Sequence, residues 1–138
     1  SDQQAKLSVF NRGLAFGDAL FETLKSLNGK LLFWEDHYFR LMASMRMLRM
    51  EIPMHFTLEF FEAEIQKLIS AFEPNSIAKV RFTVDRKEGG LYTPSTHEVQ
   101  FLIDVNINNI RIFLFTGESI SPLRMCCLKK RISFNPSP

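Results

Sequence analysis

The chain has 138 residues, the size of one ordinary domain, with 46% hydrophobic and 23% charged residues. A formal net charge of +2 gives no electrostatic case for a nucleic-acid or membrane partner, and no apolar run approaches the ~20 residues of a membrane span. Fourteen phenylalanines, against two tyrosines and one tryptophan, predict a Phe-rich core or a dry interface.

The first elements are two strands joined by a tight turn. Residues 1–15 look irregular, with a turn signal at 11–13. Residues 19–27 (ALFETLKSL) alternate imperfectly between apolar and polar side chains, which is typical of a strand partly buried on both faces. Asn28-Gly29 follows, and then KLLF, and two apolar runs joined by Asn-Gly strongly indicate a hairpin.

The next two elements are helices. Apolar side chains recur at helical spacing over residues 35–50, and Pro53 marks the end of this helix. A second helix starts at Thr57, whose side chain suits an N-cap, and it ends before Pro74.

Two further strands complete the pattern. Residues 78–85 (AKVRFTVD) alternate with period 2, and a Gly89-Gly90 loop leads to another strand near 98–105. The order strand, strand, helix, helix, strand, strand predicts an α+β fold, with an antiparallel sheet and two helices packed on one side.

The last part of the chain differs in charge from the rest. Residues 106–138 hold five basic side chains and one acidic side chain, whereas residues 1–105 hold twelve basic and fourteen acidic ones. We therefore interpret 1–105 as one domain and 106–138 as an atypical basic tail, in which 110–115 (IRIFLF) has the pattern of one more strand.

The cysteines bear on location and metal binding. Cys126 and Cys127 are adjacent, and a disulfide between neighbouring residues is strained, so we expect free thiols in a reducing cytoplasm. A metal site needs more ligands than this pair offers, so we expect none.

Three basic residues are candidates for chemistry. Arg40 lies three residues after His37 on one helix face, and it either holds a phosphate or carboxylate or belongs to a solvated surface. Arg81 interrupts an apolar strand, and it is either an anion receptor on the opposite face or a surface residue. Lys129 follows an apolar stretch, and it is either a reactive amine or part of a basic tail. The residues alone leave these alternatives open.

Several short motifs together resemble one family, the class IV aminotransferases, which are the fold-type IV pyridoxal-phosphate enzymes. The N-terminal domain of that family contains, in this order, a Gly-Asp turn, a Phe-Glu strand, an Asn-Gly hairpin and a His-x-x-Arg-Leu helix. The chain contains them as Gly17-Asp18, Phe21-Glu22, Asn28-Gly29 and residues 37–41. The later KVRFTVDRKEGGLYTP resembles the next family strand and its glycine loop, so the resemblance covers roughly residues 5–105.

The resemblance implies an enzyme with pyridoxal 5′-phosphate as cofactor and a small amino substrate, working as a homodimer. The reaction would be transamination of an amino acid, or elimination of pyruvate from aminodeoxychorismate. Arg40 matches the arginine at the cofactor phosphate, and Arg81 matches a position near the substrate carboxylate. Phe16 and Phe21 match the lining of the substrate pocket, and Lys129 matches the catalytic lysine that holds the cofactor.

Two details refine this expectation. Thr23 after Glu22 is closer to the 4-amino-4-deoxychorismate lyases than to the branched-chain aminotransferases, which usually carry Glu-Gly. Beyond Lys129 the sequence departs from the family, whose members continue into a second domain that we expect to be absent here. We therefore expect these 138 residues to bind cofactor weakly and to be inactive, with Lys129 exposed and free of covalent cofactor. The alternative function is a non-catalytic α+β module that docks a partner through a Phe-rich surface.

Overall fold

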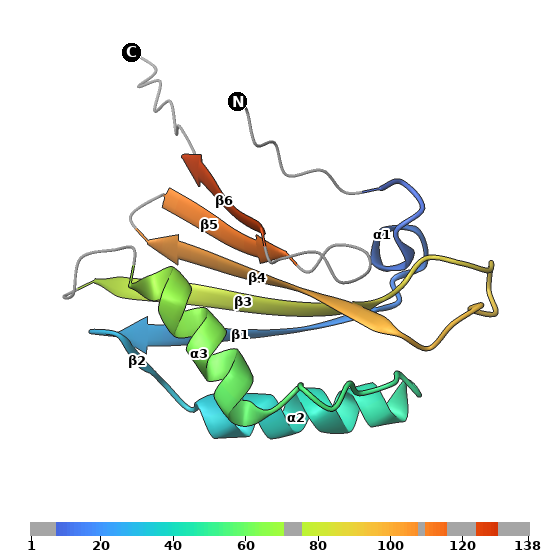
Figure 1. The fold of residues 1–138 in the computed structure, drawn as a ribbon, viewed down its shortest axis with the longest axis horizontal. Helices are drawn as coiled ribbons and strands as arrows, with labels where there is room; N and C mark the ends of the chain where they lie inside the picture. Colours follow the sequence, from blue (N-terminus) through green and yellow to red (C-terminus); the bar gives the residue numbers. More distant parts are fainter. Residues whose placement is uncertain (1–7, 71–75, 108–109, 116–123, 130–138) are drawn as a thin grey trace, which may run out of the picture.

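The computed structural model describes residues 8–70, 76–107, 110–115 and 124–129, the last two ranges as backbone only (Figure 1). No helix in these ranges is long and apolar enough to cross a bilayer. The elements in chain order are α1 (Arg12–Phe16), β1 (Ala19–Leu27), β2 (Lys30–Leu31), α2 (Trp34–Met47), α3 (Leu58–Ile69), β3 (Ile77–Arg86), β4 (Val99–Ile107), β5 (Ile110–Phe115) and β6 (Arg124–Lys129).

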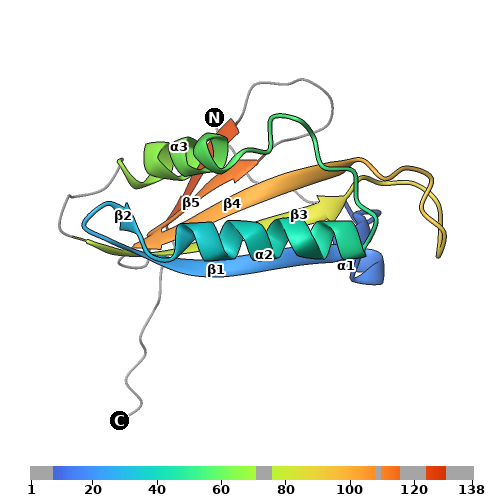
Figure 2. The same ribbon diagram turned by 90° about the horizontal axis from the view of Figure 1, so that it is seen from below.

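The strands form one antiparallel sheet in the order β2-β1-β3-β4-β5-β6. The central register aligns Leu24 with Val80, and Val80 with Val105. Both longer helices, α2 and α3, lie on the same side of this sheet (Figures 1 and 2). The predicted α+β fold, an antiparallel sheet with two helices on one side, is therefore confirmed.

The core lies between the helices and the sheet. Leu41 and Met45 of α2 are buried there, because the helical period places them on one face. Aromatic rings fill much of the space: the Phe61 ring centroid lies 4.5 Å from that of Phe82 and 5.2 Å from that of Phe101. The predicted Phe-rich core is thus confirmed for these rings, although other phenylalanines are exposed, namely Phe10, Phe16, Phe21, Phe33 and Phe39.

The predicted turn and helix boundaries have clear local causes. Asn28 and Gly29 both adopt positive φ, 52° and 79°, as a two-residue hairpin turn requires. The Thr57 hydroxyl accepts a hydrogen bond from the Phe60 amide at 3.1 Å and caps α3. The helix predicted over 35–50 ends earlier, at Met47, because Arg49 takes a φ of 54° that no α-helix can contain.

Two elements were not predicted, the short helix α1 and the strand β6 (Arg124–Lys129). Residues 12–16 form the short helix α1, where the sequence alone suggested an irregular segment. The Asn11 side chain accepts a hydrogen bond from the Leu14 amide, and Gly17 ends the helix with a φ of 66°. A helix of five residues is too short to show a periodic pattern, so its two caps were the available sequence signal.

Candidate active site

Glu22 of β1 lies on the face of the sheet that the helices cover, since it pairs in register with the buried Phe82. A carboxylate on such a face needs partners, and α2 provides them from adjacent turns. Glu22 Oε1 accepts from Arg40 Nε at 2.7 Å, and Oε2 accepts from Arg40 Nη2 at 2.6 Å. His37 Nδ1 also lies 2.7 Å from Oε2. We call Glu22, His37 and Arg40 the Arg40 cluster.

The electrostatics of the Arg40 cluster follow from these contacts. The hydrogen bonds from Arg40 lower the pKa of Glu22, more than burial raises it, and His37 adds to the lowering. Glu22 is therefore a carboxylate at neutral pH. His37 Nδ1 lies 2.7 Å from Glu22 Oε2 and 3.2 Å from Arg40 Nη2. Because a carboxylate can only accept, we assign the shorter contact as a hydrogen bond donated by Nδ1, and Nη2 then donates to Glu22 alone. The Arg40 side chain itself remains 63% exposed, whereas Glu22 is 11% exposed.

The opposite face of the sheet carries the second predicted arginine. Arg81 of β3 points away from the helices, as period 2 predicted, and its guanidinium carbon lies 4.2 Å from the centre of the Phe21 ring. Phe21 is 59% exposed. The structure thus brings Phe21 and Arg81 together, but it places Arg40 on the other face.

Both faces meet at the edge of the sheet. Strand β2 pairs with β1 only at Ser26 and Leu27, so the Ala19–Leu24 part of β1 has no strand partner on its outer side among the described residues. The Arg40 cluster lies on one side of this open edge, and Phe21 lies on the other side.

Phe16 stands at one end of this region. It is the last residue of α1, and its ring centre lies 4.8 Å from the Arg12 guanidinium and 6.1 Å from the Tyr92 ring. It also lines a groove of about 380 Å³ with a largely apolar wall, formed together with Val9, Phe10, Ala15, Glu88, Gly89, Gly90 and Leu91. Phe16 is partly exposed there, as a pocket-lining residue would be.

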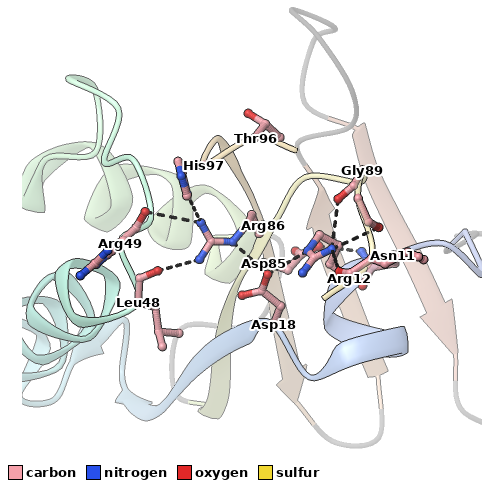
Figure 3. Close-up of polar contacts among 12 residues, drawn as sticks. Asn11, Arg12, Asp18, Leu48, Arg49, Asp85, Arg86, Gly89, Thr96 and His97 are labelled. Atoms are coloured by element: carbon pink, nitrogen blue, oxygen red, sulfur yellow. Dashed lines mark hydrogen bonds and ion pairs between the residues drawn. The ribbon is translucent and has the colours of Figure 1, made fainter. Parts of the chain in front are cut away.

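The Gly-Asp turn holds an ion-pair network that the sequence did not reveal (Figure 3). Asp18 Oδ2 accepts from Arg12 Nε and from Arg86 Nε, each at 2.9 Å. Burial alone would raise the pKa of Asp18, but the hydrogen bonds and charges of the two arginines outweigh it and lower that pKa. Arg12 and Arg86 are both buried and share this one carboxylate. We call Arg12, Asp18 and Arg86 the clamp.

The arginines of the clamp also contact two other segments, the loop between β3 and β4 and the residue that follows α2 (Figure 3). Arg12 Nη1 donates to the Leu91 carbonyl at 2.7 Å and to the Gly89 carbonyl at 3.0 Å. Arg86 Nη2 donates to the Leu48 carbonyl at 2.6 Å, just after α2. Arg86 Nη1 lies 2.6 Å from His97 Nδ1, which must accept because a guanidinium cannot. The turn, the end of α2 and the loop after β3 are thus held together.

Lys129, the predicted catalytic lysine, is the last residue of β6 and pairs in register with Ile110. Its side chain lies outside what the structure describes, as do those of Cys126 and Cys127. The role of Lys129 therefore stays a prediction.

Comparisons with known proteins bear on this arrangement. A family model described as amino-transferase class IV matches residues 19–114, which include β1, both longer helices, β3 and β4. A putative branched-chain-amino-acid aminotransferase of Methanocaldococcus jannaschii is 30% identical over 92 residues, covering 65% of this chain and 30% of the relative. A D-alanine aminotransferase of Listeria monocytogenes is 30% identical over 95 residues, covering 69% of this chain and 31% of the relative.

Solved structures agree with these matches. The 4-amino-4-deoxychorismate lyase of Pseudomonas aeruginosa superposes with a TM-score of 0.55 at 29% identity, over 86% of this chain and 38% of that one. A putative 4-amino-4-deoxychorismate lyase of Legionella pneumophila has a TM-score of 0.54 at 22% identity, covers 86% of this chain and 40% of that one, and supports the fold alone. The chain thus spans well under half the length of the relatives that it matches. Because the family match extends over most of the 138 residues, the chain belongs to the amino-transferase class IV family.

Proposed function

We propose that this chain supplies the phosphate-binding part of a pyridoxal 5′-phosphate site, in an enzyme that is an aminotransferase or a 4-amino-4-deoxychorismate lyase. The observation that carries the proposal is the Arg40 cluster at the open edge of β1. Arg40 presents a partly exposed guanidinium, and Glu22 occupies only its Nε and Nη2 donors. The remaining donors fit a phosphate, which guanidinium groups bind through paired hydrogen bonds.

The other candidate residues have complementary roles in this proposal. Pyridoxal phosphate, when bound, supplies an electron-withdrawing ring that stabilises negative charge at the substrate α-carbon. Arg81 would bind the substrate carboxylate, with the Phe21 ring over its guanidinium to exclude water from that contact. Phe16 would add apolar pocket surface. Lys129 would hold the cofactor and move a proton at the α-carbon.

Fewer observations distinguish the two reactions, amino transfer and pyruvate elimination. Thr23 after Glu22 favours the lyase, and the Pseudomonas structure that this chain resembles is a lyase. The curated relatives named above are aminotransferases. We propose the lyase branch first, and the test is release of pyruvate from aminodeoxychorismate against amino transfer to a 2-oxo acid.

Location and assembly complete the proposal. We place the protein in the cytoplasm with Cys126 and Cys127 as thiols, and we propose the homodimer that the family resemblance implies. The alternative, a module that docks a different partner, is favoured by one observation: apolar side chains stand exposed around α1 and the loop after β3, at Val9, Phe10, Leu14, Leu91 and Tyr92. Such side chains also suit a dimer interface.

The cofactor proposal is tested by NMR titration, which measures dissociation constants into the millimolar range. The chain is titrated with pyridoxal 5′-phosphate and with pyridoxal, which lacks the phosphate. We expect tighter binding of the phosphorylated form, and we expect Arg40→Ala to weaken that binding by roughly 10- to 100-fold, the scale of hydrogen bonds to a charged group. Arg46→Ala, on the exposed side of the same helix, serves as the matched control. Equal affinities for both compounds would count against the proposal.

A further inference from the structure

The contacts of Glu22 fix the guanidinium of Arg40 along one edge. Each oxygen of Glu22 accepts from a different nitrogen of Arg40, Oε1 from Nε and Oε2 from Nη2. Two parallel hydrogen bonds define the plane of the guanidinium as well as its position. The same Oε2 also accepts from His37 Nδ1, so Glu22 is itself held in place by α2.

The rest of the guanidinium faces outward. Glu22 and His37 are largely covered, at 11% and 17% exposure, whereas Arg40 is 63% exposed. Nη1 has no hydrogen-bond partner among the residues that the structure describes. Nη2 also lies 3.2 Å from His37 Nδ1, so the Nη1 end of the guanidinium is the outer edge of Arg40 that is available to an anion, and its direction is set by Glu22.

We propose that Glu22 is a positioning residue, which orients Arg40 so that the outer edge of its guanidinium receives the phosphate of pyridoxal 5′-phosphate. This inference rests on the proposed role of Arg40 and adds a second residue to it. An unrestrained arginine loses rotamer freedom when it binds an anion, and prior anchoring reduces that cost. A purely structural Glu22 would join β1 to α2 without affecting phosphate binding.

The charge of Glu22 and its positioning of Arg40 predict opposite effects on phosphate binding when the carboxylate is removed. By charge alone, a carboxylate 2.6 Å from the receptor opposes a second anion, so its removal should tighten phosphate binding. Positioning predicts that its removal weakens binding. Asp36 offers the matched control for charge. Glu22 raises the pKa of Arg40 through a hydrogen bond and through its charge, whereas Asp36 raises that pKa through its charge alone.

The experiment measures dissociation constants of pyridoxal 5′-phosphate and pyridoxal by NMR titration of the 138-residue chain. The variants are Glu22→Gln, Arg40→Ala, the double variant, Glu22→Asp and Asp36→Asn. We expect Glu22→Gln to weaken binding of the phosphorylated form about 3- to 30-fold, the range of couplings between contacting residues. In the Arg40→Ala background the same change should have no effect, and pyridoxal binding should not change in any variant.

The remaining variants separate charge from geometry. Glu22→Asp keeps the charge but shortens the side chain, so it should weaken binding, and it serves as the test if Glu22→Gln does not fold. Asp36→Asn should leave binding unchanged or slightly tighter. Tighter binding by Glu22→Gln, unchanged binding by both Glu22 variants, or the same weakening in the Arg40→Ala background would each overturn the inference. If Arg40→Ala itself has no effect on the phosphorylated form, the proposed function fails first.

Discussion

Ser26 places a hydroxyl group in the core. It is fully buried on the helix-covered face of β1, and its Oγ has no hydrogen-bond partner among the described residues. A buried polar group without a partner costs about 1–3 kcal/mol. Ser26→Ala should therefore raise the free energy of unfolding by about 1 kcal/mol, measured by urea titration. Ser70→Ala is the control, because the Ser70 hydroxyl donates to the Lys67 carbonyl at 2.7 Å and gains nothing from removal.

Asp85 makes the stability depend on pH. Burial raises the pKa of this carboxyl above its ordinary value of 3.8, although hydrogen bonds from Gln100 and Asn11 lower it in part. A raised pKa in the folded state means that its stabilising contribution is complete below 3.8 and is lost as the pH rises through the folded-state pKa. Asp85→Asn keeps an oxygen that accepts from both amides, at 2.7 Å and 2.6 Å in the present chain.

The expected result is a variant that gains on the wild type as the pH rises. Asp85→Asn should be the more stable protein at pH 7, and the difference in free energy of unfolding should shrink towards pH 4. Urea titrations at several pH values measure this difference. Asp36→Asn, at an exposed position on α2, should show the wild-type pH profile. A difference that grows on acidification would have the wrong sign for a buried carboxyl.

At the residue scale, the sequence indicated the cationic donors of the site more readily than the carboxylate that Arg40 contacts. Arg40 stood out because it shares a helix face with His37, and Arg81 stood out because it interrupts an apolar strand, whose period placed it on the correct face. Glu22 received no role, although it interrupts the helix-covered face of β1 and so needed a cation. The identity of that cation depends on how α2 packs across β1, and the pattern of a single strand does not predict helix packing.

At the scale of elements, Arg86 ties β3 to the end of α2. Its guanidinium is 6% exposed and donates to Asp18 and to the Leu48 carbonyl, from different nitrogens. Arg86→Lys keeps the charge but loses the planar fork, so it should destabilise the fold by about 2 kcal/mol or more, as measured by urea titration. Arg81→Lys, an exposed arginine on the same strand, should change stability by less than about 1 kcal/mol. If both variants lost the same free energy of unfolding, the hydrogen bonds of the Arg86 guanidinium would contribute no more to stability than an exposed arginine does.

The same scale explains which elements the sequence predicted. β1, α2, α3, β3 and β4 were predicted because each is long enough to show a period, and β2 because Asn28-Gly29 fixes its turn. α1 escaped because it depends on contacts from far along the chain. Asn11, which caps it, donates to Asp85, and Arg12 donates to the loop after β3. A local sequence pattern does not predict contacts with residues so far along the chain.

For the whole molecule, the exposed apolar side chains predict association. Val9, Phe10 and Leu91 line the same groove and are more than half exposed. Tyr92, 93% exposed, contacts the groove residue Phe16, and exposed apolar patches promote self-association. We expect a dimer or larger species by light scattering at moderate concentration. Leu91→Ser with Tyr92→Ser should shift the population towards monomer, whereas Met54→Ser, an exposed residue away from the groove, should not. A monomeric wild-type chain would contradict this expectation.

The place of β1 beside β3 has a consequence for how the chain folds. Ala19 pairs with Asp85, so α2 and α3 lie between the two strands in sequence, and their pairing closes a long loop. Local helices form faster than such distant pairings. During synthesis, β1 must wait for β3 to emerge before its inner edge finds a partner. Pulsed hydrogen exchange during refolding should therefore protect amides of α2 and α3 before those that join β1 to β3.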